Sequence, residues 1–214
     1  MNQPAPRRVA VLVSGHGSNL EALLAAGPGY GFEVVLVVSD RPGVRAIEVA
    51  QAAGVGTEVV DFTAHAGDRD GFDLALRDVV AASRPDAVCL AGFMRILGPG
   101  FVGAFGARIV NTHPSLLPAF RGAHAVRDAI AYGVKLTGCT IHLVDEQVDH
   151  GPVLLQAAVE VGRDDDEASL HERIKALEHR LLPEAVALVA AGRVRLDGRR
   201  AHLTPALRTT EGKQ

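Results

Sequence analysis

The stretch RVAVLVSGHGSNLEALLAA, residues 8–26, decides the fold of this chain. Residues 8–14 are almost continuously apolar, which is typical of a strand that is covered on both faces. Residues 18–26 follow a helical pattern, with Ser18 as a candidate N-cap. A glycine turn joins the two segments, so the stretch predicts a strand, a tight turn and a helix in that order.

The same alternation of apolar strand and helix continues through the first half of the chain. Further strands are predicted at 33–39, 57–62, 85–93 and 108–111, and helices at 44–54 and 69–83. Strands that are separated by helices are joined by right-handed crossovers and pair in parallel. The N-terminal half therefore predicts a parallel sheet with helices on both faces.

The pattern changes after residue 134. Two apolar runs at 135–145 and 151–161 are joined by only a few residues, which predicts an antiparallel pair. A long helix, kinked at Pro183, is predicted over 165–191, and a hairpin over 193–203 turns at Asp197-Gly198. The expected fold class is α/β, a Rossmann-like open sheet that is mostly parallel, with an antiparallel C-terminal part and a long C-terminal helix.

The composition limits the classes of function. The chain has 214 residues, 48% of them hydrophobic, and a formal net charge of −3. That charge argues against a nucleic-acid partner, and no apolar run approaches the roughly 20 residues that span a membrane. Cys89 and Cys139 are expected to be buried thiols of a cytoplasmic protein. We expect one domain over 1–214, with halves of about 8–110 and 111–203 and a flexible polar tail over 204–214.

The glycine turn SGHGSNL, residues 14–20, has the position and composition of an anion site. Backbone N–H groups at a helix N-terminus attract anions, and glycines let a phosphate approach the backbone closely. A dinucleotide fingerprint would need a third glycine at Leu20, and the Walker pattern is absent. The turn therefore suits a phosphate monoester, or its glycines serve only a tight turn; the residues alone leave both interpretations open.

Two polar residues lie at the end of the predicted strand at 108–111: Asn111 is its last residue, and His113 follows two positions later. Asn111 and His113 are two residues apart, so they share one face at the carboxyl end of a strand, where α/β sites form. A carboxylate beside His113 would favour a protonated imidazole. That imidazole and the Asn111 amide would then be two donors for a developing oxyanion, as acyl transfer requires, and the imidazole could also move a proton. Alternatively His113 is a structural histidine, or His113, His142 and Asp149 hold a metal.

Four motifs resemble the folate-dependent formyltransferases, and the first narrows the resemblance to the phosphoribosylglycinamide branch. They are SGHGSNL (14–20), LAGFMRIL (90–97), VNTHPSLLPAF (110–120) and HLVDEQVDHGPVLLQ (142–156). The resemblance extends from Val9 to about Leu203. It implies transfer of the formyl group of 10-formyltetrahydrofolate to the amine of phosphoribosylglycinamide in purine synthesis. Small molecules would be the only ligands, no metal would be needed, and the chain would be a monomer or homodimer.

The resemblance also implies roles for particular residues. The catalytic trio would be Asn111, His113 and Asp149. The phosphoribosyl substrate would meet Gly17, Ser18, Asn19, Lys175 and Glu178. The folate would meet Arg69, Met94, Arg95, Ile96, Leu97, Val102 and Asn111. The first half of the domain would bind the phosphate, and the second half would bind the folate and carry the catalytic residues.

Other interpretations stay open at this point. By spacing alone, Lys175 and Glu178 could form a solvated helix face, and Arg69 could be an exposed residue at a helix start. The sequence does not decide whether His16, His142 or His150 contacts a ligand. A formyltetrahydrofolate deformylase-like hydrolase would use the same trio, and a phosphate-binding module without turnover is a further alternative.

Overall fold

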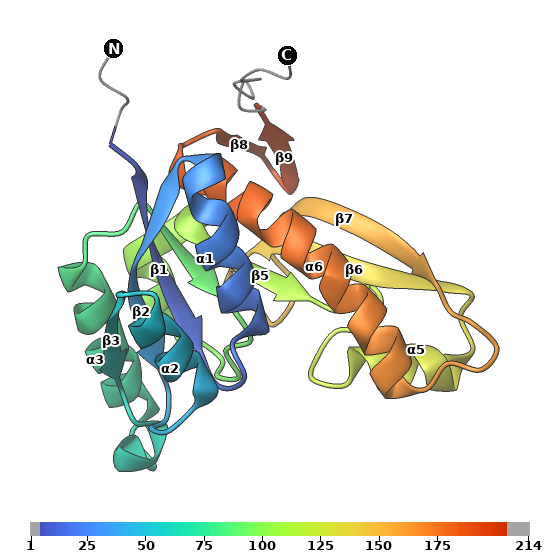
Figure 1. The fold of residues 1–214 in the computed structure, drawn as a ribbon, viewed down its shortest axis with the longest axis horizontal. Coiled ribbons are helices and arrows are strands. Elements are labelled where there is room, and N and C mark those ends of the chain that lie inside the picture. The colour runs from blue at the N-terminus through green and yellow to red at the C-terminus, as the bar shows by residue number, and fades with distance from the viewer. Residues whose placement is uncertain (1–4, 205–214) are drawn as a thin grey trace.

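The computed structural model describes residues 5–204, and the tail that the sequence predicts after Thr204 lies outside them. One seven-stranded sheet organises the chain, in the order β3-β2-β1-β4-β5-β6-β7 (Figure 1). Its strands are β1 (Arg7–Val13), β2 (Phe32–Ser39), β3 (Gly56–Val59), β4 (Ala87–Leu90), β5 (Ile109–His113), β6 (Leu136–Leu143) and β7 (Val153–Glu160). A separate hairpin pairs β8 (Val194–Asp197) with β9 (Arg200–Leu203).

The strand directions confirm the predicted fold class. β1 pairs in parallel with β2 and β4, β2 with β3, and β4 with β5. β6 runs antiparallel to both β5 and β7. The sheet is therefore parallel through its first five strands and antiparallel at its C-terminal edge.

Helices cover both faces of the sheet. They are α1 (Ser18–Tyr30), α2 (Arg45–Ala52), α3 (Arg69–Ala82), α4 (Pro99–Phe105), α5 (Ala125–Tyr132) and α6 (Glu167–Ala190), with short 3-10 turns at Phe62–His65 and Gly106–Arg108. Val9, Val11 and Val13 of β1 pack with residues of α1, α2 and α6, while Ala10 and Leu12 pack with α3 and α4. Alternate residues of one strand thus enter two different core layers, which explains the continuous apolar run.

Several predicted boundaries are wrong, each for a local reason. Ser18 is not an N-cap: the cap is Gly17, in the left-handed conformation and without a side-chain hydrogen bond, and Ser18 is the first helical residue. The predicted strand at 57–62 is too long, because Asp61 accepts a hydrogen bond from the Thr63 N–H and starts a 3-10 turn. α4 and α5 were not predicted; both are short, and α4 contains two glycine residues in seven.

The long helix α6 confirms the prediction over 165–191 with small changes. Asp166 caps it in a reciprocal capping box with Ser169, so the helix begins at Glu167. It runs as one element to Ala190 with Pro183 inside it, and it lies in front of the strands beside α1 (Figure 1). This placement brings α6 side chains to the carboxyl ends of the central strands.

Candidate active site

A cleft of about 690 Å³ lies at the carboxyl ends of β1, β4 and β5. The strand order of the sheet reverses between β1 and β4, and ligands of open α/β sheets bind at such a switch point. Segments from all four sequence motifs meet around it. The lining comprises residues 14–19, 90–97, 111–114, 122–123, 142 and 144–149, together with His171, Lys175 and Glu178 of α6.

Most of the predicted site residues line this one cleft, and two do not. Those that line it are Gly17, Ser18, Asn19, Met94, Arg95, Ile96, Leu97, Asn111, His113, Asp149, Lys175 and Glu178. Arg69 instead donates from its guanidinium to the Ile96 carbonyl oxygen at 2.9 Å, behind the 94–97 segment. Val102 is buried and lines a separate hollow of about 500 Å³, which shares residues 144–147 with the cleft.

Asn111 and His142 form a direct pair because they are opposite each other in the antiparallel register of β5 and β6. Nδ1 of His142 lies 2.8 Å from the Leu143 carbonyl oxygen, so it carries a proton. Nε2 then accepts a hydrogen bond from Nδ2 of Asn111 at 3.1 Å. Burial lowers the pKa of His142, in agreement with this neutral tautomer. The Asn111 amide is thereby oriented, and it carries a second N–H for a ligand.

His113 is buried and has acceptors beside both ring nitrogens. Nε2 lies 2.8 Å from the Phe120 carbonyl oxygen, and Nδ1 lies 3.4 Å from Oδ2 of Asp149. The side chains of His113 and Asp149 are only 5% and 10% exposed, so water screens their interaction weakly. Two acceptors suit an imidazolium, which donates from both nitrogens, better than a neutral ring.

Asp149 is held from two sides in an unusual conformation. Its φ of 49° is left-handed, which few non-glycine residues adopt and aspartate tolerates comparatively well. Oδ2 accepts a hydrogen bond from the Gly122 N–H at 2.8 Å, while Oδ1 lies 3.9 Å from Nε2 of His142. The carboxylate therefore faces His113, as the resemblance implied, and it also faces His142, which the sequence did not decide.

The segment after His113 is fixed to the sheet through Thr140. The Thr140 hydroxyl donates to the Ser115 carbonyl at 2.7 Å and accepts from the Leu117 N–H at 3.0 Å. Gln156 of β7 donates to the Leu117 carbonyl and to the same hydroxyl. These bonds hold the chain that presents the Phe120 carbonyl and the Gly122 N–H to His113 and Asp149.

The glycine turn forms the opposite end of the cleft. Gly17 has φ +86°, and a Cβ added there would lie 2.9 Å from the Ala46 Cα, so the turn needs glycine both for conformation and for space. α1 begins at the next residue, which directs the N–H groups of its first turn toward the cleft. Asn19 is buried, and its Oδ1 is a buried atom without a hydrogen-bond partner in the described part of the chain.

Glu178 connects the two ends of the cleft. Its side chain is 4% exposed, so a solvated helix face is the wrong interpretation for this residue. Oε1 accepts from the Thr112 hydroxyl at 2.9 Å and Oε2 from the Asn19 amide at 3.4 Å. Lys175, one turn earlier, pairs with Glu172 at 2.6 Å and keeps a side chain that is 32% exposed beside the cleft.

The 94–97 segment lines the cleft after β4. The Met94 N–H donates to Oγ of Ser14 at 2.9 Å, while the Arg95 guanidinium turns away to Asp40, at 2.6 Å, and to the face of Phe62. Burial opposes ionisation of Asp40, but hydrogen bonds from Arg41, Ser14 and Arg95 prevail and lower its pKa. The Met94 and Ile96 side chains, 67% and 57% exposed, form an apolar border.

Sequence reasoning missed some of the residues that line the cleft. His171 lies four residues before Lys175 on α6, and that spacing, which puts both on one helix face, was the signal that could have found it. Ser14 and Gly122 act through a hydroxyl and a backbone N–H, for which the sequence carries no signal. Within residues 5–204, no group of three or more His, Cys, Asp or Glu side chains is placed to hold a metal ion.

Comparison with known proteins places the chain in a family. The family model described as formyl transferase matches residues 7–186. The chain belongs to the formyl transferase family. The chain is 52% identical over 198 residues to the phosphoribosylglycinamide formyltransferase of Mycobacterium tuberculosis, and the match covers 92% of this chain and 91% of that protein.

Two further matches support the same placement. This formyl transferase is 44% identical to the trifunctional purine biosynthetic protein adenosine-3 of Bos taurus, over 91% of this chain and 19% of that protein. It superposes on the crystal structure of glycinamide ribonucleotide transformylase 1 from Symbiobacterium toebii with a TM-score of 0.90 and 44% identity, over 94% and 95% of the two chains. The chain is thus an enzyme of the formyl transferase type, with the fold of its relatives.

Proposed function

We propose that this chain transfers the formyl group of 10-formyltetrahydrofolate to the amine of phosphoribosylglycinamide, in purine biosynthesis. One observation carries the proposal: the Asn111, His113 and Asp149 side chains meet in the same cleft as the glycine turn and Glu178. The first group suits acyl transfer, and the second suits a phosphorylated sugar. Relatives that bear the name of this activity match nearly the whole chain.

The phosphoribosyl end would bind at the glycine turn. The N–H groups of residues 17–19 and the Lys175 ammonium attract the phosphate. Glu178 and the unpartnered Oδ1 of Asn19 are acceptors for ribose hydroxyls, as both are buried beside the turn. Bound in this way, the substrate extends its amine along β5 toward Asn111 and His113.

The folate would bind on the other side of the trio. Its pteridine has hydrogen-bonding edges that match the exposed backbone of residues 94–97 and 144–148, and an apolar body that matches the border formed by Met94 and Ile96. Arg69 and Val102 do not line the cleft, and their contacts with folate stay predictions: Arg69 bonds to the Ile96 carbonyl oxygen, and Val102 lines the neighbouring hollow.

The chemistry follows from the hydrogen bonds of the trio. The amine attacks the formyl carbon, and the carbonyl electron pair moves to oxygen, giving a tetrahedral oxyanion. The second N–H of Asn111 and the Nε2–H of His113 donate to that oxygen, His113 exchanging the Phe120 carbonyl for it. The oxyanion electron pair then re-forms the carbonyl as the bond from carbon to the folate nitrogen breaks, and the His113 imidazolium gives its Nε2 proton to that nitrogen. The neutral ring takes the proton that the amine loses, which restores the imidazolium that Asp149 stabilises.

We also propose how the chain is divided into functional parts. The two halves act as one domain, with the phosphate bound mainly by the first half and the folate and catalysis served mainly by the second. Within the described residues, no helix has the length and apolar character needed to cross a membrane. Cytoplasmic location and a monomeric or homodimeric state stay predictions.

The test is a direct assay of the purified chain. With 10-formyltetrahydrofolate and phosphoribosylglycinamide, tetrahydrofolate and the N-formyl product should appear in equal amounts. Formate released without the amine would instead identify a deformylase-like hydrolase, and saturable binding without turnover would identify a binding module. His113→Ala should abolish product formation while leaving phosphoribosylglycinamide binding, measured by calorimetry, largely unchanged.

A further inference from the structure

The hairpin formed by β8 and β9 lies beyond residue 186, where the match to the formyl transferase family model ends. Its turn nevertheless contacts the segment 144–150, which carries Asp149. Leu196 of the hairpin lines the same hollow as Val144–Gln147, and these four residues also line the main cleft. The segment therefore borders both the active-site cleft and the hollow that the hairpin lines.

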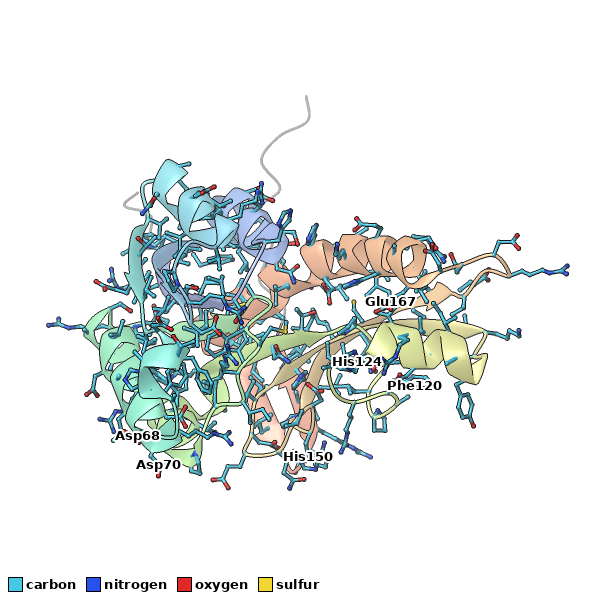
Figure 2. The ribbon with its side chains drawn as sticks, turned by 90° about the horizontal axis from the view of Figure 1, so that it is seen from below. Asp68, Asp70, Phe120, His124, His150 and Glu167 are labelled. Atoms are coloured by element: carbon cyan, nitrogen blue, oxygen red, sulfur yellow. The ribbon has the colours of Figure 1, made fainter. Side chains whose placement is uncertain are left out.

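Arg199, in the turn between β8 and β9, reaches His150 with two donors. One guanidinium nitrogen lies 3.0 Å from Nε2 and 3.4 Å from Nδ1 of His150, which places it over the face of the imidazole ring, and the other donates to the His150 carbonyl oxygen. Since a carboxylate can only accept, the ring nitrogen that faces Asp145, Nδ1, carries a proton. Nδ1 of His150 (labelled in Figure 2) donates to Oδ2 of Asp145 at 2.7 Å.

Asp145 accepts hydrogen bonds from two residues of its own segment, Gln147 and His150. Its Oδ1 accepts a hydrogen bond from the Gln147 N–H at 3.0 Å while its Oδ2 accepts from His150. Burial opposes ionisation of Asp145, but the hydrogen bonds from His150 and the Gln147 N–H prevail and lower its pKa. Arg199, His150 and Asp145 thus form a bridge, here called the hairpin clamp, that joins both ends of the segment 145–150 to the hairpin.

The hairpin clamp ends next to Asp149. A Cβ added at Gly151 would lie 1.8 Å from the Leu143 carbonyl oxygen, so the backbone after His150 presses directly against β6. Asp149 has a left-handed backbone conformation, and its carboxylate is held by the Gly122 N–H. The next residue, His150, is held through its ring by Asp145 and through its carbonyl oxygen by Arg199. A change of backbone angle at His150 would therefore move the Asp149 carboxylate relative to His113.

We propose that Arg199 is a positioning residue for formyl transfer, acting through His150 and Asp145 to hold the Asp149 carboxylate against His113. The inference rests on the proposed function and assigns it a residue outside the part of the chain that the family model matches. His150 and Asp145 are 28% and 36% exposed, and exposed ion pairs contribute little to global stability. A purely structural role for Arg199 would thus leave turnover nearly unchanged, whereas positioning makes turnover sensitive to it.

The experiment compares Arg199→Ala with Arg200→Ala, which removes the same charge from an exposed residue of the same hairpin. We expect kcat to fall by about 10-fold to 100-fold in the first variant only, as for other small displacements of catalytic groups. The KM for phosphoribosylglycinamide should stay within about twofold, because its phosphate binds at the other end of the cleft. His150→Ala should lower kcat similarly, the double variant should lower it no further, and Arg199→Lys should restore part of the loss.

A measurement without substrate separates this inference from the proposed function. Amide hydrogen exchange of residues 145–150 should be faster in Arg199→Ala than in Arg200→Ala and in the unaltered chain. If the unaltered chain transfers no formyl group, the proposed function fails, and the exchange rates still decide whether Arg199 holds the segment. Equal exchange and equal kcat in the two variants would overturn the inference.

Discussion

Replacing Asp149 by asparagine tests the central electrostatic interaction of the site. The amide has nearly the shape of the carboxylate, and with its oxygen in the place of Oδ2 it still accepts from the Gly122 N–H. Asp149→Asn therefore removes the negative charge beside Nδ1 of His113 while it preserves the packing of the loop. The change in rate then reports charge rather than position.

The magnitude follows from the geometry. Two unit charges 3.4 Å apart attract by about 5 kcal/mol when the effective dielectric constant is about 20. Roughly half of this should appear in the barrier, because the neutral amide oxygen still presents an acceptor beside Nδ1 of the imidazolium. A barrier raised by about 2–3 kcal/mol lowers kcat by on the order of 100-fold.

The assay is release of tetrahydrofolate at saturating concentrations of both substrates. Asp149→Asn should lower kcat by that factor and leave the KM for phosphoribosylglycinamide nearly unchanged, since the charge lies at the catalytic end. Asp128→Asn, on the exposed face of α5, is the matched control and should behave as the unaltered chain. A kcat within about threefold of the unaltered value would refute the electrostatic role of Asp149.

Three further outcomes are expected. Glu178→Gln should raise the KM for phosphoribosylglycinamide by about 10-fold, because hydrogen bonds from ribose hydroxyls to a charged acceptor are stronger than those to an amide. Steady-state kinetics measure this change in KM. Gly17→Ala should destabilise the chain by about 1–2 kcal/mol in urea unfolding, because the left-handed φ and the approach to Ala46 both oppose a side chain. Burial lowers the pKa of His142, so its contribution to stability is complete above the unfolded pKa of about 6.5 and is lost as the pH falls toward the pKa in the folded chain. The free energy of urea unfolding, measured between pH 8 and 5.5, should therefore fall more steeply in the unaltered chain than in His142→Gln.

The sheet was predictable because its strands carry their own signal. β1, β2 and β4 are apolar at every position that the two core layers require, and the change to antiparallel pairing followed from the short connection before β7. α4 and α5 carried too little pattern, since a seven- or eight-residue helix offers barely two turns of periodicity. Their positions depend on packing against α3 and α6.

The candidate site was predictable only in part. Strand periodicity places Asn111 and His113 on one face, and His142 follows from the register of β5 with β6 once the pairing is known. The position of Asp149 depends on a left-handed backbone and on Gly151 packed against Leu143, neither of which spacing can show. The burial of Glu178 was likewise invisible, because it arises where α6 crosses β5 and the start of α1.

Glu178 links the proposed substrate-binding end of the cleft to the proposed catalytic end. Its two carboxylate oxygens bond to Asn19, in the first turn of α1, and to Thr112, which lies between Asn111 and His113 in β5. A buried carboxylate is stable only when both oxygens are satisfied, so a shift at either end disturbs the other. We therefore infer that one side chain of α6 sets the distance from the proposed phosphate site to the proposed oxyanion donors. An amine carried on a phosphoribosyl group of matching length should reach the trio, and a shorter or longer one should not.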